Sequence, residues 1–208
     1  MRFFEYDSPI MSFLSKVFDL VCLNMLTIIF SIPVITMGAA LTAAHYTALK
    51  LRRNEGNVFK SFWKSFKENF RQSTVIWLMF VFCFVVSIVT YNLGINISGT
   101  YAIAIRGIVL GVLILSALLF VWVIPLQSKF INPISATLKN ALCLAYKHLI
   151  QTVLMMLLNS LPIGTLILII YATSMRGMSV WLLFGISVPV YLCAMTYDKI
   201  FEKLEELA

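Results

Sequence analysis

Long apolar runs alternate with short polar stretches along this chain of 208 residues. After residue 71, four long windows contain no Asp, Glu, Lys or Arg; they are residues 72–105, 107–128, 148–175 and 177–197. Each window can hold a helix of about 20 residues, the length that crosses a hydrocarbon core of roughly 30 Å. Backbone groups in lipid must form hydrogen bonds within their own segment, so these runs predict transmembrane helices rather than strands or loops.

The pattern predicts an all-α, polytopic transmembrane bundle that forms a single membrane domain of six spans. The spans cover about 9–32, 34–51, 73–91, 101–125, 150–173 and 177–195. Only Pro33, a helix breaker, separates the first two, so residues 34–51 are either a second span or the tail of the first. The alternative is therefore five spans with the N-terminus on the outer side.

Two further segments have a helical period without the composition of a span. In residues 57–71, aromatic side chains form one stripe and basic side chains form another. Residues 134–148 are a second amphipathic segment, mostly aliphatic on one side and with Lys139, Asn140 and Lys147 on the other. Such helices lie in the membrane interface, so we predict two amphipathic interfacial helices on the cytoplasmic side. The first contacts either anionic lipid or a partner subunit through Phe59, Lys60, Phe62, Trp63, Lys64, Phe66, Lys67, Phe70 and Arg71.

Composition and charge placement agree with a membrane protein. The chain is 61% hydrophobic and 12% charged, with a mean hydropathy of +0.93, which excludes an ordinary soluble domain. The net charge of +7 does not indicate nucleic-acid binding, because seven of the sixteen basic residues lie in 50–71, between apolar runs. This is the positive-inside pattern. It predicts that both termini face the cytoplasm and that residues 198–208 form a charged cytoplasmic tail.

A few polar groups fall inside the predicted spans, where they are costly and therefore informative. Asp19 either pairs with Lys16 near the inner interface or belongs to a functional polar site. His45 is interpreted as a packing residue with its hydrogen bonds satisfied, and Arg106 is expected to extend toward the outer headgroups. The full set of candidate intramembrane polar residues is Asp19, Asn24, His45, Arg106 and Asn159.

Prolines and glycines mark possible irregularities in the spans. Pro33 and Pro162 each follow a serine and an aliphatic residue. Such positions either bend or end a span, or free carbonyls for a solute, as in carriers with broken helices. Gly107 and Gly111 have the spacing that allows close helix packing, within this chain or against another subunit.

No sequence motif indicates catalysis. The chain has no GxxxxGK phosphate loop, no HExxH and no GxSxG, so it is not expected to be an enzyme. The cysteines, Cys22, Cys83, Cys143 and Cys193, are far apart, so no metal site, cofactor or disulfide is expected.

Four stretches carry a resemblance to a known family. They are residues 6–11, Ser31–Ala40, Phe59–Gln72 and Leu138–Leu142. Together they resemble the YesL family, small bacterial integral membrane proteins that form a domain of unknown function. At Lys147-His148 the chain departs slightly from the arginine-histidine pair that is more frequent in the family.

The resemblance implies a place in the bacterial cytoplasmic membrane. Genes of that family often neighbour carbohydrate ABC importers, so we expect a non-enzymatic accessory subunit that contacts the importer's permease subunits and aids its assembly or function. The alternative is a small-solute carrier, for sugars, in its own right.

Overall fold

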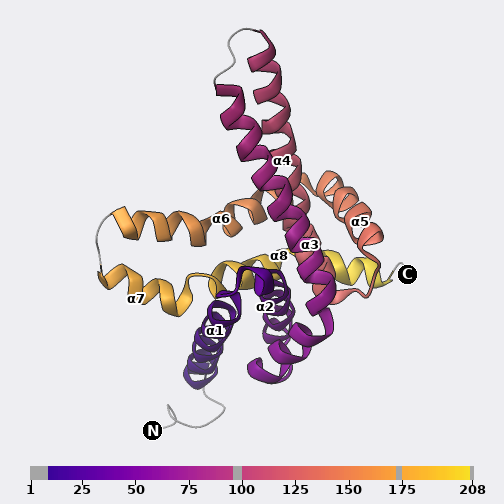
Figure 1. Cartoon of the computed structure of the whole chain (residues 1–208). Helices are drawn as coiled ribbons and strands as arrows, with labels where there is room; N and C mark the ends of the chain where they lie inside the picture. The colour runs from indigo at the N-terminus through magenta and orange to yellow at the C-terminus, as the bar shows by residue number, and fades with distance from the viewer. Residues whose placement is uncertain (1–8, 96–99, 172–174, 207–208) are drawn as a thin grey trace.

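The computed structural model describes residues 9–95, 100–171 and 175–206, and every element in them is helical (Figure 1). The all-α prediction is therefore confirmed. The elements, in chain order, are α1 (Pro9–Ser31), η1 (Val34–Thr36), α2 (Met37–Arg52), α3 (Val58–Ile95), α4 (Thr100–Lys129), α5 (Ile134–Lys147), α6 (Leu149–Tyr171), α7 (Met175–Phe184) and α8 (Ser187–Glu206).

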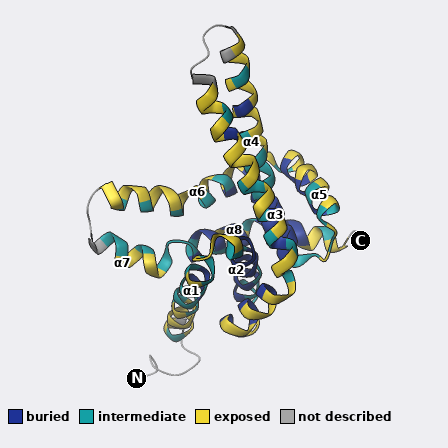
Figure 2. Cartoon of the chain, in the orientation of Figure 1, coloured by how far each residue is buried: buried dark blue, intermediate teal, exposed yellow. Residues whose placement is uncertain are grey.

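The centre of the molecule is α2, which packs against α1, α3, α4 and α8. Its alanines at 39, 40, 43, 44 and 48 have no exposed surface (Figure 2). Gly38 faces α3 so closely that a Cβ there would lie 2.4 Å from Trp77 Cβ and 2.6 Å from the Ser73 carbonyl oxygen. Small residues let helix backbones approach, and here they make α2 the hub of the core.

The structure does not confirm six spans. At 16 residues, α2 is about 24 Å long and does not qualify as a span. Four helices, α1, α3, α4 and α6, are long and apolar enough to cross a membrane, and α7 with α8 makes a fifth if the two count as one span bent by 41°. These apolar helices indicate a multi-pass membrane protein.

The first predicted interfacial helix is not a separate element. Residues 58–72 and the span at 73–91 form one continuous helix, α3, of 38 residues, which is about 57 Å long. It begins at Asn57, whose side-chain Oδ1 accepts the backbone N–H groups of Phe59 at 3.0 Å and Lys60 at 3.4 Å. Asn54 and Gly56 supply the positive-φ turn between α2 and α3. The structure therefore does not confirm a separate interfacial helix in this segment.

Residues 134–148, predicted to form the second interfacial helix, are helical as α5 at nearly the expected bounds, and their position in a membrane interface stays a prediction. Its buried residues include Thr137, Ala141, Leu144 and Ala145, and it packs chiefly on α4. The charged tail expected from residue 198 is instead nearly half of α8, as far as residue 206; residues 207–208 lie outside the described part. Within it Asp198 is 2% exposed and Phe201 is fully buried.

Two apolar arms leave the core in different directions (Figure 1). One is the distal part of the α3–α4 hairpin and the other is made of α6 and α7. Most of their side chains are exposed (Figure 2); Phe82 is 69% exposed on the first arm and Leu168 is 69% exposed on the second. Apolar surface on this scale needs lipid or another protein to cover it.

Candidate functional site

The most strongly built polar site lies where α2 crosses α8. The carboxylate of Asp198 accepts Arg52 at 2.9 Å and Arg53 at 2.7 Å, and Arg53 also reaches Glu202 at 3.4 Å. Arg52 donates further to the backbone carbonyls of Ala194 and Met195. The hydrogen bond to Asp198 raises the pKa of the Arg53 guanidinium. A buried carboxylate held by two guanidinium groups fixes the angle between the two helices.

A second pair of side chains joins the same two helices deeper in the core. The ring Nδ1 of His45 lies 3.3 Å from the Tyr197 hydroxyl, which also donates to the His45 carbonyl oxygen at 3.2 Å. His45 is 4% exposed and Tyr197 is fully buried. His45 is thus a packing histidine with a hydrogen-bond partner in α8.

A third contact ties α8 to the end of α4. Lys129 pairs with Glu205 at 3.0 Å, and its Nζ lies 5.8 Å from the ring centres of Phe130 and Phe201. Acidic residues at positions 198, 202 and 205 thus lie on one face of α8 and meet basic residues of α2 and α4. Three ion-paired positions align α8 across the base of the core.

Asn24 of α1 contacts the backbone at the bend between α7 and α8. Its Nδ2 donates to the Leu182 carbonyl at 2.6 Å, and its Oδ1 accepts the N–H groups of Ile186 at 2.8 Å and Ser187 at 2.9 Å. The interruption frees these backbone groups, and in an apolar setting each must find a partner. Asn24 is fully buried, so it acts as a clamp on the bend.

The sequence did not point to this bend. Pro162, where a break was considered, lies inside the continuous helix α6. Its carbonyl accepts the Trp181 indole N–H at 2.9 Å. The break falls at Gly185, where a side chain would come within 2.6 Å of the Trp181 carbonyl oxygen. Gly185 followed by Pro189 was the available signal, because both residues disfavour a straight helix.

Asp19 borders a polar cleft instead of pairing with Lys16. Within the described residues no ion pair joins it to Lys16; both border a cleft of about 560 Å³ between α1 and the α2–α3 turn. The other lining residues are Met11, Ser12, Ser15, Leu51, Asn54, Glu55 and Gly56. The cleft shares no residue with the Asp198 network, but its residues Leu51 and Asn54 flank Arg52 and Arg53 in sequence.

The remaining intramembrane candidates are dispersed. Asn159 donates to the Met155 carbonyl at 2.8 Å and contacts Cys193 Sγ at 3.4 Å. Arg106 lies on the exposed side of α4, near Tyr91 and Asn92. Pro33 forms the extended turn between α1 and η1. Asn24, His45 and Asn159 each contact the α7–α8 segment, but from different sides.

Gly107 and Gly111 do not make the close packing that was expected within the chain. A Cβ at either position would have no neighbour within 4 Å. Their face of α4 therefore contacts no other helix of the described chain, and it is open to lipid or to another subunit.

The aromatic stripe of α3 divides into a packed half and an exposed half. Phe62 and Phe66 are buried, with ring centres 5.6 and 4.9 Å from that of Phe30. Phe59 is 62% exposed and Trp63 is 38% exposed. The basic residues stay on the surface; Lys67 lies 4.8 Å over the Trp63 ring, and Lys64 is 4.0 Å from Glu68.

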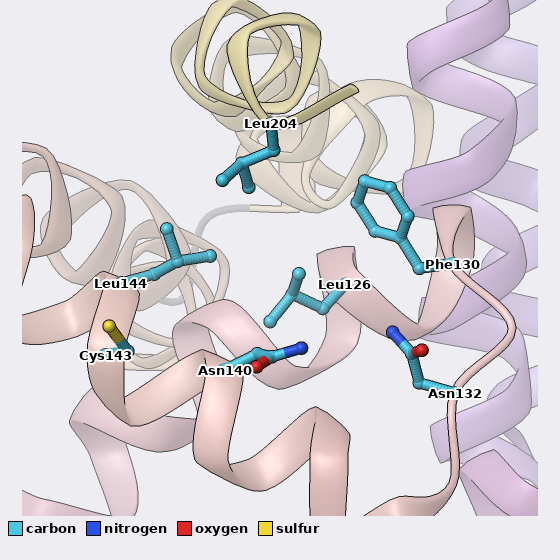
Figure 3. Close-up of a pocket in the computed structure, with 7 residues that line it drawn as sticks. All are labelled: Leu126, Phe130, Asn132, Asn140, Cys143, Leu144 and Leu204. Atoms are coloured by element: carbon cyan, nitrogen blue, oxygen red, sulfur yellow. The ribbon is translucent and has the colours of Figure 1, made fainter. Parts of the chain in front are cut away.

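A small pocket lies between the end of α4, α5 and α8 (Figure 3). Its volume is about 240 Å³. Apolar side chains surround it, the amides of Asn132 and Asn140 border one side, and the free thiol of Cys143 lies at its edge; the apolar residues are Leu126, Phe130, Leu144 and Leu204. An apolar cavity of roughly 150 Å³ admits a benzene ring, so this pocket has room for one large apolar side chain.

Comparison with known proteins finds one family that part of this chain resembles. A family model described as "Protein of unknown function, DUF624" matches residues 20–91. The chain is similar to this family of unknown function. The match runs from the second half of α1 through most of α3, and so includes Asn24, His45, the Arg52–Arg53 pair and the aromatic-basic stripe. Searches of curated proteins and of solved structures gave no match.

Proposed function

We propose that the protein is a non-enzymatic accessory subunit that docks onto another protein of the bacterial cytoplasmic membrane. The partner we propose is the permease part of a carbohydrate ABC importer, as the resemblance to the YesL family implies. The observation that carries the docking proposal is the exposed aromatic-basic face of α3, formed by Phe59, Lys60, Trp63, Lys64 and Lys67.

The continuity of α3 favours a protein partner over lipid for this face. If the apolar part from residue 73 spans the bilayer, Trp63 lies roughly 15 Å and Phe59 roughly 21 Å beyond that point along the helix axis. Headgroups close to the hydrocarbon do not reach that far. Burying an exposed aromatic side chain contributes about 1.5–3 kcal/mol, so a partner that covered this face would gain appreciable affinity.

The basic residues of this face would also orient the partner. Lys60, Lys64 and Lys67 follow the exposed aromatics along the same side of α3. An acidic surface on the partner would meet this row, steer the encounter and fix the register of the two proteins.

The test is co-purification from the native host with single charge reversals on the proposed face. We expect Lys64→Glu and Lys67→Glu to reduce recovery of the permease subunits, while the protein stays inserted and folded. Lys139→Glu is the matched control, because Lys139 is exposed on α5, away from this face. Deletion of the gene should also lower carbohydrate uptake. Full recovery of the partner with both reversals would refute docking through α3.

The carrier hypothesis has less support. A solute site needs polar groups that are available to the solute, yet the amide of Asn24 is fully engaged by backbone groups and that of Asn159 bonds to α6 and α8. A carrier would produce sugar flux in proteoliposomes that contain this protein alone, and we expect none above empty liposomes.

The polar contacts also support a common side for the loops predicted to be cytoplasmic. Arg52 pairs with Asp198, Gln127 donates to Asn69, and Lys129 pairs with Glu205. We propose that residues 52–72, the α4–α5 turn and the end of α8 all face the cytoplasm. Met11 and Ser12 of α1 line the same cleft as Asn54 and Glu55 of the α2–α3 turn. The start of α1 thus lies beside that turn, so we propose that the N-terminus also faces the cytoplasm, as in the arrangement with both ends inside.

Cysteine labelling in a variant without the four native cysteines tests this orientation. An impermeant reagent should modify Leu93→Cys, near the far end of α3, in intact cells, and Ser12→Cys only after permeabilisation. It should modify Glu55→Cys, Ser135→Cys and Glu206→Cys only after permeabilisation. Labelling of Glu55→Cys from outside would overturn the scheme, and labelling of Ser12→Cys from outside would return the N-terminus to the outer side, as in the five-span alternative.

A further inference from the structure

An apolar groove of about 520 Å³ lies where the α3–α4 arm meets α6. Four side chains from α3, four from α4 and one from α6 line it; they are Trp77, Phe80, Val81, Phe84, Leu113, Ser116, Ala117, Phe120 and Ile163. Phe84 is 56% exposed and Ile163 is 65% exposed, so the groove is open to its surroundings. All three helices are candidate spans, and the groove therefore lies at hydrocarbon depth.

The hollow has a simple cause in the sequence of α4. Its lining residues recur at 113, 116, 117 and 120, one helical face, on which Ser116 and Ala117 are small and lie between Leu113 and Phe120. Toward the core, aromatic side chains close the space between α3 and α4. Phe120, for example, contacts Trp77 at 5.9 Å and Phe80 at 5.3 Å between ring centres. Two missing side-chain volumes thus leave a groove between rigid walls.

The lining chemistry restricts the occupant to hydrocarbon. Of the nine side chains, only Ser116 and Trp77 carry a polar atom, and the Trp77 indole N–H is donated to the Val34 carbonyl at 2.8 Å. A sugar, nucleotide or peptide would leave its own polar groups without partners here, which costs several kcal/mol.

Size separates the two apolar occupants, a lipid chain and a partner helix. An apolar cavity of roughly 150 Å³ binds benzene, so 520 Å³ has room for roughly three times as many carbon atoms, the size of an acyl chain. A stable protein interface uses about 20–30 residues on each side, whereas nine line this groove. The groove thus fits a chain better than a helix.

We propose that this groove holds an acyl chain of a bilayer lipid, which fills the angle between the two arms. The lipid is then part of the fold rather than a passing neighbour, since it touches α3, α4 and α6 at once. This inference depends on the spans alone and is independent of the docking function of α3.

The experiment uses the full-length protein in dodecylmaltoside micelles, titrated with phosphatidylcholine brominated in mid-chain. Bromine quenches indole fluorescence on contact, and Trp77 lines the groove. Subtracting the signal of Trp77→Phe isolates this tryptophan. We expect its quenching to saturate at a low lipid fraction, and lipid analysis should find about one tightly retained lipid per protein.

Filling the groove supplies the discriminating variant. Ala117→Phe should abolish the saturable quenching and the retained lipid. Leu115→Phe is the control, because Leu115 faces away from the groove and is already 48% exposed. If Ala117→Phe does not fold, Ser116→Leu replaces it.

Two results would overturn the proposal. The first is quenching that rises without saturation and is equal in the filled and control variants, which indicates ordinary contact with bulk lipid. The second is cross-linking of Ser116→Cys to another protein in native membranes with no lipid retained, which assigns the groove to a partner helix.

Discussion

The crossing of α2 and α8 and the two apolar arms use the same kinds of helix in opposite ways. At the crossing, small residues and paired charges bury one another; Ala44, Ala194 and Tyr197 have no exposed surface, and Asp198 is 2% exposed. On the arms, large aliphatic side chains face outward, and Gly107 and Gly111 have no neighbour. At the crossing, specific contacts fix one arrangement of the two helices. The exposed side chains of the arms are stabilised only by the apolar medium around them. The two regions should therefore respond differently to the same type of substitution.

The largest effect is expected at the centre of the ion-pair network. Asp198→Ala leaves Arg52 and Arg53 without their shared carboxylate and should destabilise the fold by about 3 kcal/mol. Glu206→Ala, on an exposed position of the same helix, is the control. Equilibrium unfolding in detergent measures both, and equal stabilities would show that the network does not hold the crossing.

The clamp at the α7–α8 bend comes next. Asn24→Leu keeps a similar volume but removes the partners of Leu182, Ile186 and Ser187. Each unsatisfied buried group costs about 1–3 kcal/mol, although the bend can relax and recover part of this. We expect a loss of about 2 kcal/mol in unfolding and faster proteolysis between α7 and α8. Asn159→Leu, which affects fewer groups, should cost less; the reverse order would contradict the role of Asn24.

The same substitution, made in the packed core and on an arm, contrasts buried and exposed helix surfaces directly. Gly38→Ala forces a Cβ into Trp77 and the Ser73 carbonyl and should cost about 1–3 kcal/mol. Gly107→Ala meets no other atom of the described residues within 4 Å and should raise stability by about 0.5–1 kcal/mol, since alanine favours a helix. A loss of stability at Gly107 in the membrane, but not in detergent, would mean that a second subunit packs there.

The smallest effect is expected from pH. Burial, followed by the charges of Lys147 and Lys203, lowers the pKa of His148 below its ordinary value of 6.5. Folding then disfavours the protonated ring, so stability should rise as pH increases toward 6.5 and level off above it. His148→Gln should remove this part of the pH dependence in thermal unfolding between about pH 5 and 8. An unchanged slope would assign the dependence to other groups.

Several features follow from local sequence because they need no distant partner. Hydropathy marks the apolar helices α1, α3, α4 and α6, since each meets the same medium along its length. Pro33 separates two helices because its ring blocks the backbone hydrogen bond wherever it occurs. The small residues of α2 indicate close packing because only small side chains allow it.

Other features were decided only by the tertiary structure. Residues 34–51 have the hydropathy of a span, yet α2 is enclosed by other helices. Hydropathy alone does not distinguish a protein interior from lipid. The sequence predicts a charged tail at the end of α8 because the basic partners of Asp198 are about 145 positions away along the chain. Asn24 clamps a bend 158 to 163 residues further along. Such contacts depend on which helices meet, and the periodicity of a single helix carries no information about the identity of its neighbour.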